Sequence, residues 1–328
     1  AEGVDRLLAL EKQTRQGGDE PSTTKVVRCI VEVCLEARDW PRLKEVLVVI
    51  SKRRQQFRNT IQTSVQVTMD AFPSLPDKAT KLDLIDTLRA ITEGKIFVEV
   101  ERARLTRMLA QMKEEEGNVN EAAELLQEVQ VESFGTMDAR EKLDFILEQI
   151  RLCLAKGDFV RAQIISRKVT NKALSKPEFQ EIKVSYHLLM VKFHTHQKDY
   201  LNIARSHWAI YDTPVVLADK ARWQPALTLA AVNAALAPYG NEQYDLLNRI
   251  FVDKRLSELP QYKKLLKYFT TTELIRWPTL LGEYKGALTQ LPSFAESSET
   301  LLKDLQARVV EHNIRVIAQY YERIATPR

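Results

Sequence analysis

A short turn motif recurs along this chain at intervals close to 40 residues. Each copy places Asp or Asn between a polar or glycine residue and an apolar residue, and a helix-like run follows. The copies are Arg38-Asp39-Trp40, Gly117-Asn118-Val119, Gly157-Asp158-Phe159 and Lys198-Asp199-Tyr200. The gaps between them are 79, 40 and 41 residues, and the first is close to two repeats. This period is typical of stacked helix pairs, because one pair cannot bury its own apolar face. The sequence therefore predicts a solenoid with an extended partner-binding surface.

The composition favours helix over most of the chain. The 328 residues contain 10 glycines and 12 prolines, which leaves few of the turn-rich segments that short strands require. Hydrophobic residues make up 45% of the sequence, enough for a sizeable core. The predicted fold class is all-α, an α-solenoid of helix pairs similar to TPR or HEAT repeats.

The charges are mixed and nearly balanced. There are 48 Lys and Arg residues against 44 Asp and Glu residues, a net charge of +4, whereas strong nucleic-acid binders tend to be more one-sided. Two basic clusters are nevertheless candidates for contact with phosphate or with an acidic protein surface. They are Lys52, Arg53, Arg54 and Arg58, and Arg102, Arg104 and Arg107. A solvated surface is the first interpretation, protein contact the second and nucleic acid the third.

The cysteines and the apolar segments indicate in which cellular compartment the protein is located. Cys29, Cys34 and Cys153 form no disulfide framework, and their apolar surroundings predict buried thiols in a reducing compartment. No stretch approaches the roughly 20 apolar residues that cross a bilayer, and the first residues carry no basic-then-apolar leader pattern. We therefore expect the protein to be located in the cytoplasm and nucleus and to have no membrane partner.

The chain is predicted to begin with a short helix and a flexible linker over residues 1–24. Gly17-Gly18-Asp19-Glu20-Pro21-Ser22 is the flexible stretch, and Thr23 or Thr24 is expected to cap the helix that follows. Helix pairs then continue over residues 25–222, where Pro73, Pro76 and Asp77 occupy the place of the missing repeat boundary. Ala122 and Ala162 each follow a turn by four residues, and their small side chains should let two helices approach closely.

Signatures of catalysis and of metal binding are missing from the sequence. There is no phosphate-binding glycine loop, no dinucleotide fingerprint, no nucleophile elbow and no His-Glu-x-x-His. Four histidines gather in one segment, but His194 and His196 would point about 200° apart on a helix. The histidines are His187, His194, His196 and His207. We therefore expect that the chain is not an enzyme and that it binds neither a metal ion nor a cofactor.

The character of the sequence changes after Trp223. Residues 227–237 are apolar and rich in alanine, which predicts a tightly packed helix ending at Pro238. Thr270, with Glu273 three residues later, is expected to form a capping box at a helix start. Residues 301–324 predict a long amphipathic helix with one apolar stripe. That stripe comprises Leu305, Val309, Val316, Tyr320 and Ile324.

Several uncommon short sequence segments in the second half of the chain resemble one protein family. They are Leu236-Ala237-Pro238-Tyr239 with Asn241-Glu242-Gln243, Tyr262-Lys263-Lys264-Leu265-Leu266-Lys267, Thr270-Thr271-Thr272-Glu273-Leu274-Ile275-Arg276-Trp277 and Arg308-Val309-Val310-Glu311-His312-Asn313-Ile314-Arg315. They closely resemble the non-ATPase subunit 12 family of the 26S proteasome regulatory particle. The resemblance covers nearly the whole chain, and it is diffuse in the first half and specific from about Trp223 onward.

The resemblance implies a non-catalytic scaffold subunit of the proteasome lid. It implies a right-handed helical-repeat arm leading into a PCI domain, whose helical part would occupy residues 223–328 and whose winged helix would be absent. Tyr320 and Tyr321 would then be either core residues or apolar surface that a winged helix covers.

The implied partners are other lid PCI subunits, the deubiquitinating subunit, the base ATPase ring and the core particle. The alternatives are the paralogous PCI subunit of the COP9 signalosome and a nucleic-acid-binding PCI protein.

Overall fold

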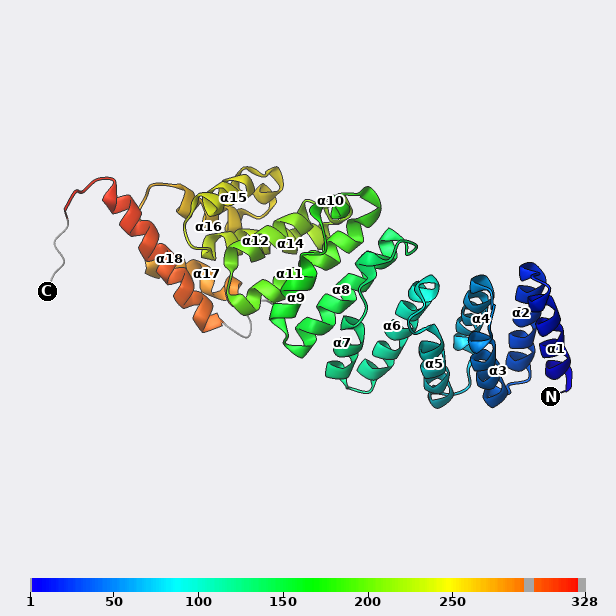
Figure 1. Ribbon diagram of the computed structural model, residues 1–328. Coiled ribbons are helices and arrows are strands. Elements are labelled where there is room, and N and C mark those ends of the chain that lie inside the picture. Colours follow the sequence, from blue (N-terminus) through cyan, green and yellow to red (C-terminus); the bar gives the residue numbers. More distant parts are fainter. Residues whose placement is uncertain (1, 292–297, 324–328) are drawn as a thin grey trace. The chain divides into compact units, whose positions relative to one another are not determined.

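The computed structural model describes residues 2–291 and 298–323, and they form helices joined by short turns (Figure 1). No strand occurs within these residues, so the predicted all-α fold class is confirmed. The fold divides into two compact units, residues 1–161 and residues 162–328. The first contains α1 (Glu2–Gln16), α2 (Glu20–Glu36), α3 (Trp40–Lys52), α4 (Arg58–Asp70), α5 (Lys78–Thr92), α6 (Glu99–Glu115), α7 (Val119–Gln127) and α8 (Ala139–Lys156).

The second unit combines short and long helices. Its elements are α10 (Asn171–Leu174), α11 (Gln180–Gln197), α12 (Tyr200–Tyr211), α13 (Pro214–Leu217), α14 (Lys220–Leu236), α15 (Asn241–Val252), α16 (Pro260–Thr270), α17 (Trp277–Thr289) and α18 (Ser298–Ala318). The short helix α9 (Phe159–Ser166) contains the boundary between the two units. The division of the chain at residues 222 and 223 stays a prediction. In the part of the chain that is described, we find no helix both long enough and apolar enough to span a bilayer.

The core of the first unit runs along the row of helices. Apolar residues at helical spacing on α2 and α3 are fully buried, among them Val27, Ile30 and Leu43. Helix α2 packs against α1, α3 and α4, and α3 packs in turn against α5. Each helix therefore buries its apolar stripe against neighbours on both sides, as the solenoid prediction requires.

The recurring motif reverses the chain at all four predicted turns, and three copies also cap the next helix, whereas Asn118 makes no side-chain cap hydrogen bond. Its first residue is left-handed and ends one helix, with φ of 52° at Arg38, 83° at Gly157 and 55° at Lys198. The Asp that follows caps the next helix, since the Oδ1 atoms of Asp39 and Asp158 accept the backbone N–H three residues on, at 3.1 and 3.0 Å. The motif thus satisfies free backbone groups on both sides of the chain reversal.

The predicted linker contains a further copy of this turn. Gly18 has φ of 75°, and Asp19 caps α2 by accepting the N–H of Ser22 at 3.1 Å. Helix α2 therefore begins at Glu20, inside the stretch that was expected to be flexible, and the prediction of Thr23 or Thr24 as cap is wrong. Thr23 is buried within the helix. At the missing repeat boundary, Oδ1 of Asp77 caps α5 by accepting the N–H of Thr80 at 2.6 Å.

Helix α14 is the centre of the second unit. From Ala226 to its end nearly every residue is buried, and α12, α15, α16 and α18 all pack against it (Figure 1). Its alanines, such as Ala230 and Ala234, are fully buried, which allows the neighbouring helices to come close. The tightly packed apolar helix predicted at residues 227–237 is confirmed, and it ends at Leu236 before Pro238.

The predicted capping box at Thr270 is wrong. Helix α16 ends at Thr270, and α17 begins only at Trp277. The backbone between them is held from α18. The N–H of Ile275 donates to Oδ1 of Asn313 at 2.8 Å, and Nδ2 of Asn313 donates to the carbonyl of Ile275 at 2.9 Å. A side chain 38 residues away therefore determines this segment, and no local signal could indicate it.

Helix α18 is shorter than predicted. It ends at Ala318. Leu305, Val309 and Val316 are buried on one stripe as expected, whereas Tyr320 is exposed beyond the helix end. Ile324 lies outside the described residues.

The predictions of burial for two alanines and three cysteines were partly correct. Ala122 and Ala162 are both buried, and α7, which carries Ala122, packs against α6 and α8, whereas a close helix approach at Ala162 stays a prediction. Cys34 and Cys153 are buried as well, but Cys29 is exposed because it lies on the outer face of α2.

The packing of α9 gives a direct test. Replacing Ala162, which is 1% exposed, with Asp should lower the unfolding free energy by about 3 kcal/mol, because the carboxylate would be buried without a partner. Thermal unfolding measures this. Val160→Asp is the matched control, since Val160 lies on the same helix, is 73% exposed and should change stability by less than about 0.5 kcal/mol. An unaltered melting curve for Ala162→Asp would show that α9 packs in another register.

Candidate partner-binding surfaces

The first basic cluster is divided between internal structure and surface. Glu11 is fully buried and pairs with Arg53 and with Arg15, while Gln56 donates to it at 3.0 Å. Burial lowers the pKa of Arg53. Arg53 therefore stabilises the fold, and only Lys52, Arg54 and Arg58 of the predicted cluster are exposed.

The second basic group is largely engaged within the unit. Arg102 donates to the carbonyl of Arg89 at 2.9 Å. Arg104 makes two hydrogen bonds to Glu141, at 2.6 and 2.8 Å, and this pairing raises the pKa of Arg104 and lowers that of Glu141. Arg107 is half-buried. The two predicted clusters therefore do not form one continuous basic patch, and a partner-binding role of these residues stays a prediction.

Of the four histidines in α11 and α12, His207 is buried, His187 and His194 are half-buried, and His196 is exposed. Burial holds the pKa of His207 at about 4, so the ring is neutral at pH 7. Its Nε2 atom has no hydrogen-bond partner within the described chain. Nδ1 of His194 lies 3.9 Å from Asp199. Among the described residues, no three His, Cys, Asp or Glu side chains are placed to hold a metal ion.

Tyr320 and Tyr321 are both exposed, so the core alternative for them is wrong. Val310 and Ile314, one turn apart on α18, are also exposed. Leu274 is exposed too, on the segment that Asn313 holds. The surface at α18 is therefore partly apolar, as one of the two alternatives predicted, and its partner is a separate question.

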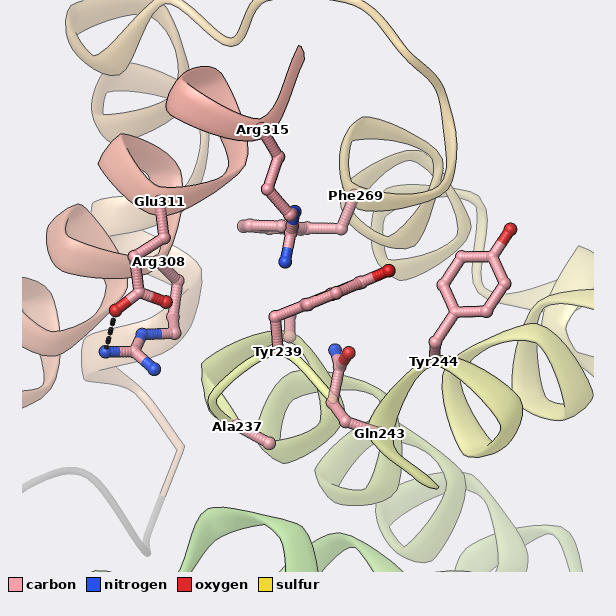
Figure 2. A pocket seen from close by; sticks show the side chains of 9 residues that line it. Ala237, Tyr239, Gln243, Tyr244, Phe269, Arg308, Glu311 and Arg315 are labelled. Carbon is pink, nitrogen blue, oxygen red and sulfur yellow. Dashed lines mark ion pairs between the residues drawn. The ribbon is translucent and has the colours of Figure 1, made fainter. Parts of the chain in front are cut away.

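A small hollow next to α18 was not predicted from the sequence (Figure 2). We call it the Tyr239 notch. It is bounded by the turn after α14, the start of α15, the end of α16 and one face of α18. Its lining residues are Ala235, Ala237, Tyr239, Gln243, Tyr244, Phe269, Arg308, Glu311 and Arg315.

Arg315 is the central side chain of the Tyr239 notch. Its guanidinium carbon lies 3.5 Å from the centroid of the Tyr239 ring, and Figure 2 shows the Phe269 ring beside it. Such a cation–π contact is favourable because the ring face carries partial negative charge. Burial lowers the pKa of Arg315 from its usual value, although the group stays charged at neutral pH.

The remaining contacts fix the walls of the notch. Arg308 pairs with Glu311 at 2.7 Å, one turn along α18. Nε2 of Gln243 donates to the carbonyl of Ala234 at 2.9 Å, which ties α15 to the end of α14. Tyr239 and Tyr244 meet edge to face with centroids 6.4 Å apart. The spacing of Arg308 and Arg315 on one helix face is a sequence signal, but their juxtaposition with Tyr239 is visible only in the fold.

Comparison with known proteins assigns the chain to a family. Residues 2–219 match the sequence model of the family described as PSMD12/CSN4, N-terminal. The chain is 44% identical over 327 residues to the 26S proteasome non-ATPase regulatory subunit 12 of Dictyostelium discoideum, which covers 100% of this chain and 73% of that protein. It is 41% identical over 325 residues to the 26S proteasome regulatory subunit RPN5 of Saccharomyces cerevisiae, covering 98% and 73%.

A more distant relative is the COP9 signalosome complex subunit 4 of Drosophila melanogaster. The identity is 25% over 252 residues, which covers 76% of this chain and 60% of that protein. The fold and these relationships define an all-α helical-repeat protein of the PCI-related class. Within that class, the chain belongs to the 26S proteasome non-ATPase regulatory subunit 12 family. The resemblance to this family that the short sequence segments indicated is therefore confirmed.

The buried pair of Glu11 and Arg53 gives a second test. Arg53→Ala should lower the unfolding free energy by about 3 kcal/mol, because it removes one partner of a fully buried carboxylate. Denaturation by urea measures the loss. Lys52→Ala, at an exposed neighbour, should change stability by less than about 0.5 kcal/mol. Equally small losses of unfolding free energy for the two variants would show that Arg53 is a surface cation that does not stabilise the fold.

His207 gives a test by pH. Its pKa is about 4 in the folded chain against 6.5 when unfolded, so the unfolded state takes up the proton first as the pH falls. The stability due to the neutral ring is complete above pH 6.5 and is lost toward pH 4. Between pH 7 and pH 5 this amounts to about 2 kcal/mol. His207→Gln should therefore show a smaller loss of unfolding free energy over that interval, by this amount. Gln197→Ala, at an exposed position of α11 without a titratable side chain, should keep the wild-type pH dependence.

Proposed function

We propose that this chain is a non-catalytic scaffold subunit of the 26S proteasome lid. The observation that carries the proposal is the identity of 41 to 44% over essentially the whole chain with proteins named as regulatory subunits of the 26S proteasome. The helical-repeat fold supports it, because such arrays offer long surfaces on a rigid frame. In this role the chain would support assembly of the regulatory particle, which acts in ubiquitin-dependent protein degradation.

The chemistry of the titratable groups is consistent with a scaffold. Two of the groups with a strongly shifted pKa, Tyr200 and Tyr211, link separate elements of the second unit. The hydroxyl of Tyr200 donates to Asp304 at 2.5 Å, and that of Tyr211 donates to Asp253 at 2.8 Å. Burial, together with these carboxylates, raises the pKa of both tyrosines. These groups are committed to packing, which supports the proposal that the chain is not an enzyme.

The proposed partners follow from membership of the complex. They are other PCI subunits of the lid, the deubiquitinating subunit, the base ATPase ring and the core particle. The exposed apolar residues Val310, Ile314 and Tyr321 are one surface available for such contacts. The proposed location is cytoplasm and nucleus, where these assemblies would form.

A second candidate function is membership of the COP9 signalosome. The 25% identity to its subunit 4 motivates this candidate, and the 44% identity to the proteasome subunit makes it the weaker one. A nucleic-acid-binding role is weaker still, because Arg53 and Arg104 of the two basic clusters pair with carboxylates within the fold.

Affinity purification of the tagged full-length protein from its native cells tests the proposal. Native mass spectrometry of the eluate should identify lid and base subunits of the proteasome. The tag expressed without this chain in the same cells is the control, since it should recover none of those subunits. Recovery of signalosome subunits alone, or of RNA-bound complexes, would overturn the assignment to the proteasome.

A further inference from the structure

We propose that a hollow between α11 and α14 binds one aromatic side chain of a partner protein. The hollow lies wholly within the second unit. Its aliphatic walls come from Val184, Leu188, Ile210, Val216, Ala226 and Leu229, and we call it the Leu188 hollow. The site goes beyond the proposed function, because its chemistry does not depend on which complex the chain joins.

Polar contacts at the start of α11 hold the hollow open. Helices α11 and α14 both pack against α12, and the hollow is lined by side chains of all three. Arg222 of α14 donates two hydrogen bonds to Glu181 of α11, both at 2.9 Å. The N–H of Val215 donates to Oε1 of Gln180 at 3.0 Å, which ties α13 to α11. These ties fix the spacing of α11 and α14, so the hollow is present before any partner arrives.

The size of the hollow is sufficient for one aromatic ring. Its free volume is about 260 Å³. An apolar cavity of about 150 Å³ already admits benzene, because water finds few hydrogen-bond partners there. Atoms that border empty space lose contact energy on that side. A ring that fills the hollow would recover these contacts.

The walls favour a neutral, apolar occupant. Ile210, Val216 and Ala226 are buried and present only methyl and methylene groups. Burial holds the pKa of His207 at about 4, so its ring is neutral at pH 7. Arg222 is already paired with a carboxylate. A carboxylate or phosphate that entered would therefore lose its water without gaining a free cation.

Two side chains of the lining favour a ring over an aliphatic group. The His207 ring lines the hollow, and ring pairs attract each other beyond the effect of burying their area. Arg222 lies at the rim with 36% of its side chain exposed. Its N–H groups meet Glu181 in the guanidinium plane, which leaves the faces of the group unused by these hydrogen bonds. The positive guanidinium is attracted to the negative face of an aromatic ring.

The mouth of the hollow indicates a protein as the source of the ring. Leu188 of α11 is 48% exposed, and Pro225 of α14 is exposed as well. The paired Arg222 and Glu181 add a polar rim beside this apolar centre. An apolar pocket with a polar rim is the usual anatomy of an interface hot spot, where an aromatic anchor of the partner enters.

Methyl-detected NMR of this chain tests the proposal. The probe is N-acetylphenylalaninamide, and N-acetylalaninamide is the control with the same backbone and no ring. We expect the methyl signals of Leu188, Ile210 and Val216 to shift with the phenylalanine probe and to stay in place with the alanine probe. No shift with the phenylalanine probe, or equal shifts with both, would overturn the proposal. Larger shifts with N-acetylleucinamide would overturn the assignment to an aromatic side chain.

Variants localise the effect. Leu188→Asp places a charge at the mouth and should weaken binding of the phenylalanine probe roughly fivefold. Leu274→Asp is the matched control, since Leu274 is 59% exposed and lies outside the lining, and it should bind as the unaltered chain does. Ala226→Leu fills part of the hollow from within and should abolish the shifts. Should Ala226→Leu fail to fold, Leu188→Asp decides the test, because its side chain is half exposed. Undiminished binding by Leu188→Asp would contradict the site.

Two further measurements distinguish other occupants. Hexanol represents a small lipid-like molecule, and larger shifts with hexanol than with the phenylalanine probe would contradict an aromatic side chain. Shifts of the same methyl signals that grow with protein concentration, without any probe, would assign the hollow to a second copy of this chain. Either result would overturn the proposal.

Discussion

Burial of helix faces that no single helix pair can cover is the constraint on which this structure depends. In the first unit, α2 and α3 have fully buried apolar stripes only because helices lie on both sides of each. The chain must therefore reverse direction repeatedly without leaving free backbone groups in the core. A left-handed residue followed by a capping Asp does this at Arg38 and Asp39 and again at Lys198 and Asp199. The repeat motif is thus the local device that makes the stacking possible.

Much of the fold was predictable because its signals are local. The turns at Asp39, Asp158 and Asp199, the boundary at Asp77 and the buried alanines all depend on residues within one helix pair. The prediction was wrong where a distant residue or one helix face decided the outcome. The segment after α16 is set by Asn313 on α18, and the exposure of Cys29 depends on which face of α2 points outward. The copy of the turn at Asp19 was missed because Gly17, Gly18 and Pro21 suggested a linker.

The candidate sites were harder to predict than the fold. Basic residues were counted as surface, yet Arg53 neutralises buried Glu11 and Arg104 holds Glu141. Sequence adjacency cannot show which carboxylate a long side chain will reach. The Tyr239 notch joins residues 76 positions apart, Tyr239 and Arg315, and neither belongs to a recognisable motif. Exposure of Tyr320 and Tyr321, which the sequence left open, was resolved only by the end of α18 at Ala318.

The central claim is that a stable helical frame uses its surface to hold partners. Hydrogen–deuterium exchange tests it most directly, measured on the free protein and on the same protein within purified 26S proteasome. We expect α12 and α14 to exchange slowly in both states, because they form the buried centre of the second unit. Added protection on assembly should be confined to surface segments such as residues 239–244 and the exposed face of α18. Fast exchange of α14 in the free protein, or no added protection on assembly, would contradict the account.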